Sequence, residues 1–97
     1  MDIKKRTENG ALILALEGKL DTTTAPALEE ELAAELSGVK KLVFDLEGLE
    51  YISSAGLRLL MSAQKKLGTG NMIVRHVQEL VMEVLEVTGF TDILTIE

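Results

Sequence analysis

Hydrophobic and polar residues follow one another along the chain in blocks that predict strands and helices in turn. Two strand-like segments, Ile3 to Thr7 and Ala11 to Gly18, flank Asn9-Gly10, a dipeptide typical of a tight hairpin turn. The charges of the first segment predict an edge strand. The second segment is apolar without alternation as far as Leu16, which predicts burial on both of its faces.

Three later segments carry apolar residues at helical spacing. The first has a proline in its first turn, ends at Ser37-Gly38 and has the stripe Ala25, Leu28, Leu32 and Leu36. The second runs from about Ser54 to Leu67 with the stripe Leu57, Leu60, Met61 and Gln64, while Leu59 falls off that stripe. The third ends at Gly89 and has the stripe Val77, Leu80, Val81, Val84, Leu85 and Thr88.

Further strands are predicted between these helices. They are Lys41 to Leu46, followed by a loop over residues 47–50; Met72 to His76, preceded by a turn over residues 68–71; and Ile93 to Ile96. Helices that alternate with nearly all-apolar strands predict an α/β fold with a mostly parallel sheet. We expect one domain over residues 1–97, with five strands, an N-terminal hairpin and three main helices.

The carboxyl ends of parallel strands lie along one edge of a sheet, which is where open α/β sheets place their binding sites. Asp21 follows the second predicted strand, Asp45 ends the third, Ser53 and Ser54 come after the next loop, and His76 ends the fourth. The sequence therefore predicts that these five side chains gather at one edge.

Charge and composition exclude several classes of function. The net charge is −6, and the basic residues are scattered with almost no aromatic residues among them, so no nucleic-acid surface is indicated. The absence of cysteine excludes disulfides, thiolate metal sites and a thiol nucleophile. No apolar run has the length of a membrane span, and the first residues lack the core of a signal peptide. We expect a cytoplasmic protein that does not insert into membranes.

Serine hydrolases use a serine, a histidine and an aspartate, and the predicted edge offers Ser54, His76 and Asp45. The sequence around these residues argues against catalysis. A nucleophile elbow requires Gly-x-Ser-x-Gly, and the β-branched Ile52 stands where the first glycine is needed. The single histidine and the well-separated carboxylates do not have the spacing of a known metal-binding motif. The sequence also lacks a glycine-rich phosphate-binding loop in front of a helix. We expect no enzymatic activity, no metal and no cofactor.

Ser53 and Ser54 stand at the predicted start of the second helix, where two roles remain open. Serine is a preferred N-cap, so one of them has a purely structural role in the first reading. In the second reading the helix start presents free N–H groups to an anion, and a phosphate would add about −1.5 to −2 charges at one point of the surface. Asp21 either accepts a hydrogen bond from Ser54 or caps the first helix, and the cap is favoured.

The segment from Tyr51 to Arg58 resembles the STAS domain, in particular the stand-alone bacterial anti-sigma factor antagonists. The likeness extends over the chain: residues 16–21 resemble the family's Gly-x-Leu-Asp turn, residues 42–46 its central strand, and residues 87–90 the end of its last long helix. The resemblance implies a binding switch. The unphosphorylated antagonist binds an anti-sigma factor that is also a serine kinase and so frees a sigma factor to activate transcription; phosphorylation prevents binding, and a serine phosphatase resets the switch.

The resemblance places the phosphoacceptor at Ser54, two residues before Gly56. The commonest family pattern is Asp-Ser-Ser-Gly, and here Ser53 replaces the acid and Ala55 the second serine, which leaves Ser53 as the alternative acceptor. The expected partner-binding surface consists of Asp21, Thr22, Thr23, Ser53, Ser54, Gly56, Leu57 and Arg58. The alternative function is a constitutive accessory subunit of an ABC-type transporter or of a larger signalling assembly.

Overall fold

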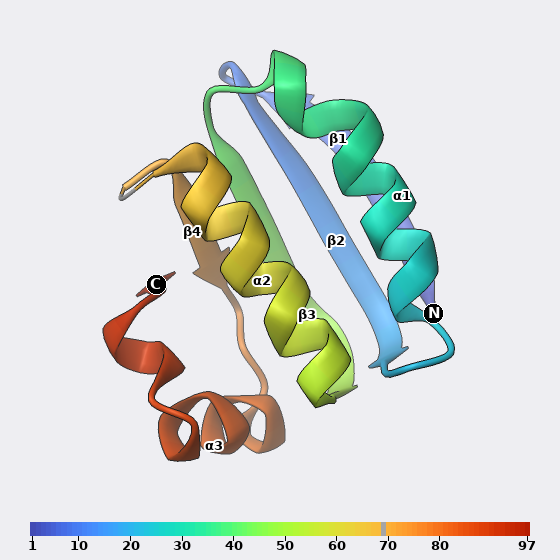
Figure 1. Ribbon diagram of the computed structural model, residues 1–97, viewed down its shortest axis with the longest axis vertical. Coiled ribbons are helices and arrows are strands. Elements are labelled where there is room, and N and C mark those ends of the chain that lie inside the picture. Colours follow the sequence, from blue (N-terminus) through green and yellow to red (C-terminus); the bar gives the residue numbers. More distant parts are fainter. Residues whose placement is uncertain (69) are drawn as a thin grey trace.

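The computed structural model describes residues 1–68 and 70–97, which form an α/β fold around a five-stranded sheet (Figure 1). The strands lie side by side in chain order. They are β1 (Asp2–Glu8), β2 (Ala11–Leu20), β3 (Leu42–Ile52), β4 (Met72–Arg75) and β5 (Thr95–Ile96). Strand β1 pairs antiparallel with β2, and the other three pairs are parallel. The predicted fold class is therefore confirmed. Thr69, within the turn predicted over residues 68–71, lies outside the described residues.

The hairpin between β1 and β2 has the two-residue turn that the sequence predicts. Glu8 pairs with Ala11, and Asn9 and Gly10 both have positive φ angles, of 51° and 80°. Two positive φ values are the requirement of a type I′ turn, whose twist matches that of the strands. Strand β1 is an edge strand, as expected.

Three main helices complete the fold: α1 (Ala25–Glu35), α2 (Ser54–Leu67) and α3 (Glu79–Val87). Short 3₁₀ turns follow α1 and α3, as η1 (Leu36–Gly38) and η2 (Phe90–Asp92). Helices α1 and α2 lie side by side across one face of the sheet, and α3 lies near the end of β3 (Figure 1). Within the described ranges, no helix combines the length and the apolar character needed to cross a membrane.

The main core fills the space between the helices and the sheet. Alternate strand residues such as Leu14, Phe44 and Val74 are fully buried there. The intervening residues Ala11, Ile13 and Val43 form a second, smaller cluster of strand residues on the opposite face. This arrangement confirms that the apolar run at the start of β2 is buried on both faces.

Strand β3 is longer than the sequence predicted, and this changes the geometry of the predicted edge. Residues 47–50, expected as a loop, continue the strand to Ile52 and stay paired with β2. The pairing shifts twice, between Ala15 and Glu17 and again between Gly18 and Lys19, so that β3 absorbs extra residues as bulges. A glycine at position 48 permits this close pairing, because an added Cβ would lie 2.7 Å from Cγ of Glu17.

The C-terminal part also departs from prediction. Strand β5 begins at Thr95 instead of Ile93, because Gly89 ends α3 with φ of 81° and the chain then makes a 3₁₀ turn. Helix α3 buries Val81 and Leu85, but Leu80, assigned to the same stripe, is 53% exposed. Leu80 therefore lies outside the face of α3 that packs against the core.

Candidate functional site

The start of α2 is fixed to the end of β2 through backbone contacts. The Ser53 N–H donates to the Leu20 carbonyl at 2.9 Å, and the Leu57 N–H donates to the Ser53 carbonyl at 3.0 Å. Ser53 is the N-cap residue and has extended backbone angles, while Ser54 occupies the first helical position. Of the two serines, Ser53 therefore holds the N-cap position, although its side chain makes no capping hydrogen bond.

Ser54 is exposed at the first position of α2. Because the first hydrogen bond within the helix is donated by Leu57, the N–H groups of the three preceding residues point out of the helix end without an intrahelical acceptor. Arg58 follows Ser54 by four residues, the spacing that places two side chains next to each other on a helix. A negative group on Ser54 thus has the helix dipole and a cation within reach.

Ser53 differs from Ser54 in its surroundings, although both carry a hydroxyl. The Ser53 side-chain oxygen is buried, and it has neither a capping hydrogen bond nor another partner among the described residues. An enzyme that transfers phosphate needs access to the hydroxyl oxygen. The geometry therefore favours Ser54 over Ser53 as a point of modification.

The turn between β2 and α1 is held by Asp21. Its Oδ1 accepts hydrogen bonds from the Thr23 hydroxyl at 2.7 Å and from the backbone N–H groups of Thr23 and Thr24 at 3.0 and 3.2 Å. The Thr23 hydroxyl, followed by the two backbone donors, outweighs desolvation and lowers the pKa of Asp21 below its usual value. The carboxylate thus orders the turn that leads into α1, but the N-cap residue of α1 is Thr24, so the interpretation of Asp21 as the helix cap is wrong. Thr22 and Thr23 stay exposed.

Gly56 lets α2 approach the sheet closely at its first turn. A Cβ at this position would lie 2.7 Å from Cγ of Leu20 and 2.8 Å from Cγ1 of Ile52. Leu57, the next residue, is buried and belongs to the core. The serine and the Asp21 turn are therefore neighbours because small and apolar residues beneath them pack tightly.

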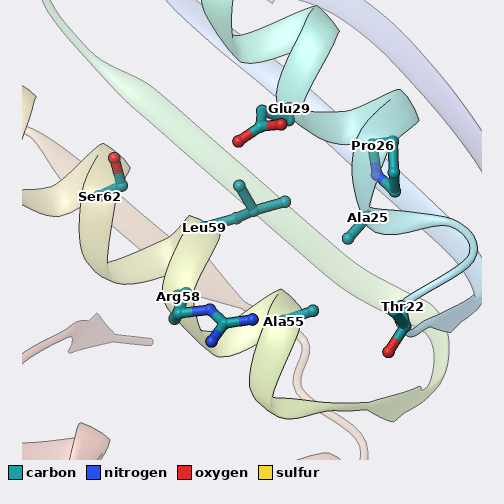
Figure 2. A pocket seen from close by; sticks show the side chains of 8 residues that line it. All are labelled: Thr22, Ala25, Pro26, Glu29, Ala55, Arg58, Leu59 and Ser62. Carbon is teal, nitrogen blue, oxygen red and sulfur yellow. The ribbon is translucent and has the colours of Figure 1, made fainter.

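A groove of about 380 Å³ lies between α1 and α2, beside this helix start (Figure 2). Its lining comes from both helices and the turn: Thr22, Ala25, Pro26, Glu29, Ala55, Arg58, Leu59 and Ser62. The sequence prediction included Thr22 and Arg58 but missed most of the others. Leu59 was the one feature of the sequence that indicated the groove. It falls off the apolar stripe of α2, and its side chain faces α1 instead of the sheet.

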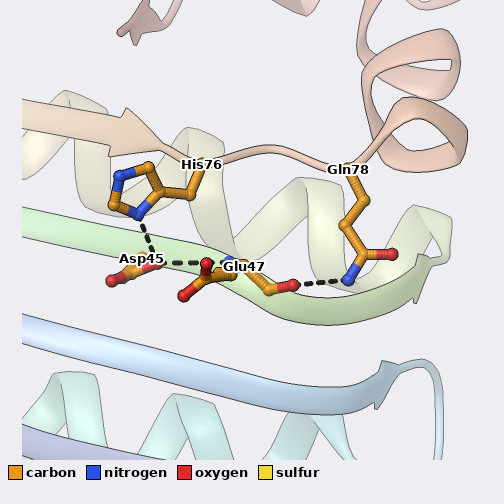
Figure 3. A network of polar contacts seen from close by, with 4 residues as sticks. All are labelled: Asp45, Glu47, His76 and Gln78. Atoms are coloured by element: carbon orange, nitrogen blue, oxygen red, sulfur yellow. Dashed lines mark hydrogen bonds and ion pairs between the residues drawn. The ribbon is translucent and has the colours of Figure 1, made fainter.

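Asp45 and His76 lie apart from this helix start, so the prediction of a single cluster is wrong. Asp45 Oδ1 is 3.1 Å from Nδ1 of His76 (Figure 3). Six residues of β3 lie between Asp45 and Ile52, a distance of about 20 Å for an extended strand. Ser54, at the start of the next helix, therefore does not complete a Ser-His-Asp relay. The cause is the length of β3, which the sequence pattern ended after Leu46.

Comparison with known proteins identifies the family to which this α/β chain belongs. A family model described as the STAS domain matches residues 2–97, and the chain belongs to this family. One relative, from Bordetella bronchiseptica, is named "Putative anti-sigma factor antagonist BtrV"; it is 38% identical over 91 residues, which cover 91% of this chain and 78% of that protein. The resemblance found in the sequence is confirmed.

Solved structures show the same fold. An anti-sigma factor antagonist from Mycobacterium paratuberculosis superimposes with a TM-score of 0.88 at 26% identity, covering 98% of this chain and 83% of that one. The Bacillus cell fate determinant SpoIIAA in its phosphorylated form gives a TM-score of 0.75 at 15% identity, covering 99% and 91% of the two chains. At this lower identity the likeness concerns the fold alone.

Proposed function

We propose that this protein is an anti-sigma factor antagonist, a non-enzymatic binding switch that phosphorylation of Ser54 turns off. The observation that carries the proposal is the exposed Ser54 at the first position of α2, next to the Asp21 turn and the groove between α1 and α2. Relatives named as anti-sigma factor antagonists support the partner class. In its unphosphorylated form the protein binds an anti-sigma factor with serine kinase activity and so releases a sigma factor.

The proposed docking surface consists of the turn residues Asp21, Thr22 and Thr23 together with the first turn of α2. Its helix part includes Ser53, Ser54, Gly56, Leu57 and Arg58; Leu57 and Gly56 are buried and shape the surface from beneath. A phosphate at its centre would lose its water when the anti-sigma factor docks, and the helix end and Arg58 would offset only part of this loss, which leaves a cost of several kcal/mol. At about 1.4 kcal/mol per tenfold, a cost of 2 to 3 kcal/mol weakens binding roughly a hundredfold. The switch requires no refolding.

The phosphoacceptor is tested with the anti-sigma factor kinase of the source bacterium, ATP and intact-mass measurement. The wild-type protein should gain one phosphate, Ser53→Ala should gain it as well, and Ser54→Ala should gain none. The two serines are adjacent, so each variant is the control for the other. Phosphate addition that persists in Ser54→Ala and vanishes in Ser53→Ala would move the site to Ser53.

The role of charge is tested by measuring the affinity for the same partner by calorimetry. Ser54→Asp should weaken binding strongly, while Ser54→Ala should keep most of it. Equal affinity of the two variants would contradict charge as the mechanism. Absence of binding by any variant would instead favour a constitutive accessory subunit. A phosphatase that removes the phosphate and restores the affinity would complete the cycle.

A further inference from the structure

A second group of chemically active side chains lies where β3 and β4 meet, away from Ser54. One oxygen each of Asp45 and Glu47 and one ring nitrogen of His76 lie within 4.8 Å of one another. Figure 3 shows the two carboxylates on the strand and the imidazole turned towards them. One imidazole with two carboxylates is a donor set that suits divalent transition metals such as Zn²⁺.

The backbone brings these three side chains together in two ways. Asp45 and Glu47 lie on either side of Leu46 in β3, and the Leu46 side chain is buried. A bulge lies at this point, since Leu46 and Glu47 together stand opposite the single residue Leu16 of β2. Bulges re-aim side chains and are frequent beside functional sites.

His76 reaches the strand face through an unusual backbone conformation. Asp45 pairs with Arg75, the last residue of β4, and His76 follows with a φ of 57°, a region that residues with a side chain seldom adopt. The positive φ turns the chain so that the imidazole lies 3.1 Å from Asp45 Oδ1. Ligands around a four-coordinate Zn²⁺ are separated by about 3.3 Å, so this pair is already at the spacing of two ligands.

Further contacts hold two of the three residues in place. Asp45 is the least exposed of the three, with 13% of its side chain accessible, and its Oδ1 accepts a hydrogen bond from the Glu47 N–H at 3.2 Å. Gln78 donates from its side chain to the Glu47 carbonyl, which links the start of α3 to the same point of β3. The Glu47 and His76 side chains are exposed, so they can move the remaining distance towards an ion.

We propose that Asp45, Glu47 and His76 form a binding site for one divalent transition-metal ion, with Zn²⁺ as the best match, and that water completes the coordination. The two carboxylates and Arg75, which pairs with Asp45, carry a formal net charge of −1, and this charge attracts a cation. Binding replaces the contact between Asp45 and His76 by bonds to the metal and joins β3 to the residue that directly follows β4. The site is independent of the proposed switch.

The test uses the full chain without an affinity tag, in a buffer without phosphate, titrated with Zn²⁺. Because the protein has one histidine, the imidazole ¹H–¹⁵N resonances report on His76 alone. They should shift to saturation at one metal per chain. Calorimetry should show that Glu47→Gln and His76→Gln each weaken Zn²⁺ binding more than about tenfold. Loss of a residue that only supports a metal ligand already weakens binding by about tenfold, so loss of a ligand itself should cost more.

Glu50→Gln is the matched control, since Glu50 is an exposed carboxylate on the same strand outside the cluster. It should bind Zn²⁺ as the wild type does, and Mg²⁺ at the same concentration should leave the imidazole resonances unchanged. The proposal is overturned if millimolar Zn²⁺ leaves these resonances unshifted. It is overturned equally if Glu47→Gln binds as tightly as Glu50→Gln, because the ion would then be adventitious.

Discussion

Gly56 and Leu20 are packed so closely that no side chain fits between them. A Cβ on residue 56 would lie 2.7 Å from Cγ of Leu20, and the neighbouring Ser53 N–H donates to the Leu20 carbonyl. The end of β2 and the start of α2 are thereby fixed to each other. Asp21 directly follows Leu20, and the exposed Ser54 directly follows Ser53. The turn and the serine therefore keep their relative position for the same reason.

Gly56→Ala should destabilise the protein even though alanine is the better helix former. The added methyl group overlaps with Leu20 and Ile52, both fully or almost fully buried, and overpacking of this kind costs about 1 to 3 kcal/mol. Urea unfolding followed by circular dichroism measures the change. Gly38→Ala is the control, because nothing lies within 4 Å of its added Cβ; an equal loss in both variants would contradict the steric explanation.

The carboxylate of Asp21 should make stability depend on pH in the acidic range. Its pKa is lowered in the folded state by the Thr23 hydroxyl and by backbone donors, so the ionised form stabilises the fold above the usual pKa of about 3.8. This contribution is lost as the pH falls through the lowered folded-state value. The stability difference between wild type and Asp21→Asn should therefore shrink below about pH 4.

Urea midpoints measured from pH 7 to pH 3 test this expectation. Thr23→Val removes the hydroxyl that donates to Asp21 at 2.7 Å, and should reproduce part of the change in pH dependence. A difference between wild type and Asp21→Asn that stays constant over this range would show that the carboxylate charge does not stabilise the turn.

Two leucines of α3 should respond differently to the same substitution. Leu85 is fully buried, so Leu85→Ala should cost about 2 to 5 kcal/mol through lost burial and the cavity that remains. Leu80 is 53% exposed, and Leu80→Ala should change the free energy of unfolding by only about 0.5 kcal/mol, as is usual at the surface. Denaturant unfolding of both variants checks the contrast; similar losses would mean that α3 packs more deeply than described.

A negative charge at Ser54 should weaken partner binding without weakening the fold. Ser54→Asp places a carboxylate in the first turn of α2, where the helix dipole stabilises it by about 0.3 to 1 kcal/mol. Thermal unfolding should therefore give a melting temperature equal to or above that of the wild type. Ser62→Asp, an exposed position in the middle of the same helix, should show no such gain. A clear loss of stability in Ser54→Asp would mean that reduced binding reflects unfolding.

The local patterns of the sequence were sufficient for the order and type of the main elements and for the start of α2, but not for the end of β3. The Asn9-Gly10 turn, the edge position of β1 and the buried Leu28 and Leu60 follow from residue types and spacing alone. These features depend on contacts between residues that are near in the chain, or on one face of one element. The resemblance of residues 51–58 to the STAS domain is local in the same sense.

Only the tertiary structure decided which distant residues meet. The bulges that carry β3 to Ile52 depend on its register with β2, and they separate Asp45 from Ser54. The approach of His76 to Asp45 and Glu47 depends on the register with β4, and the groove depends on how α1 packs against α2. Register and helix packing are set by the sum of many weak contacts across the whole core, and no short stretch of sequence contains that sum.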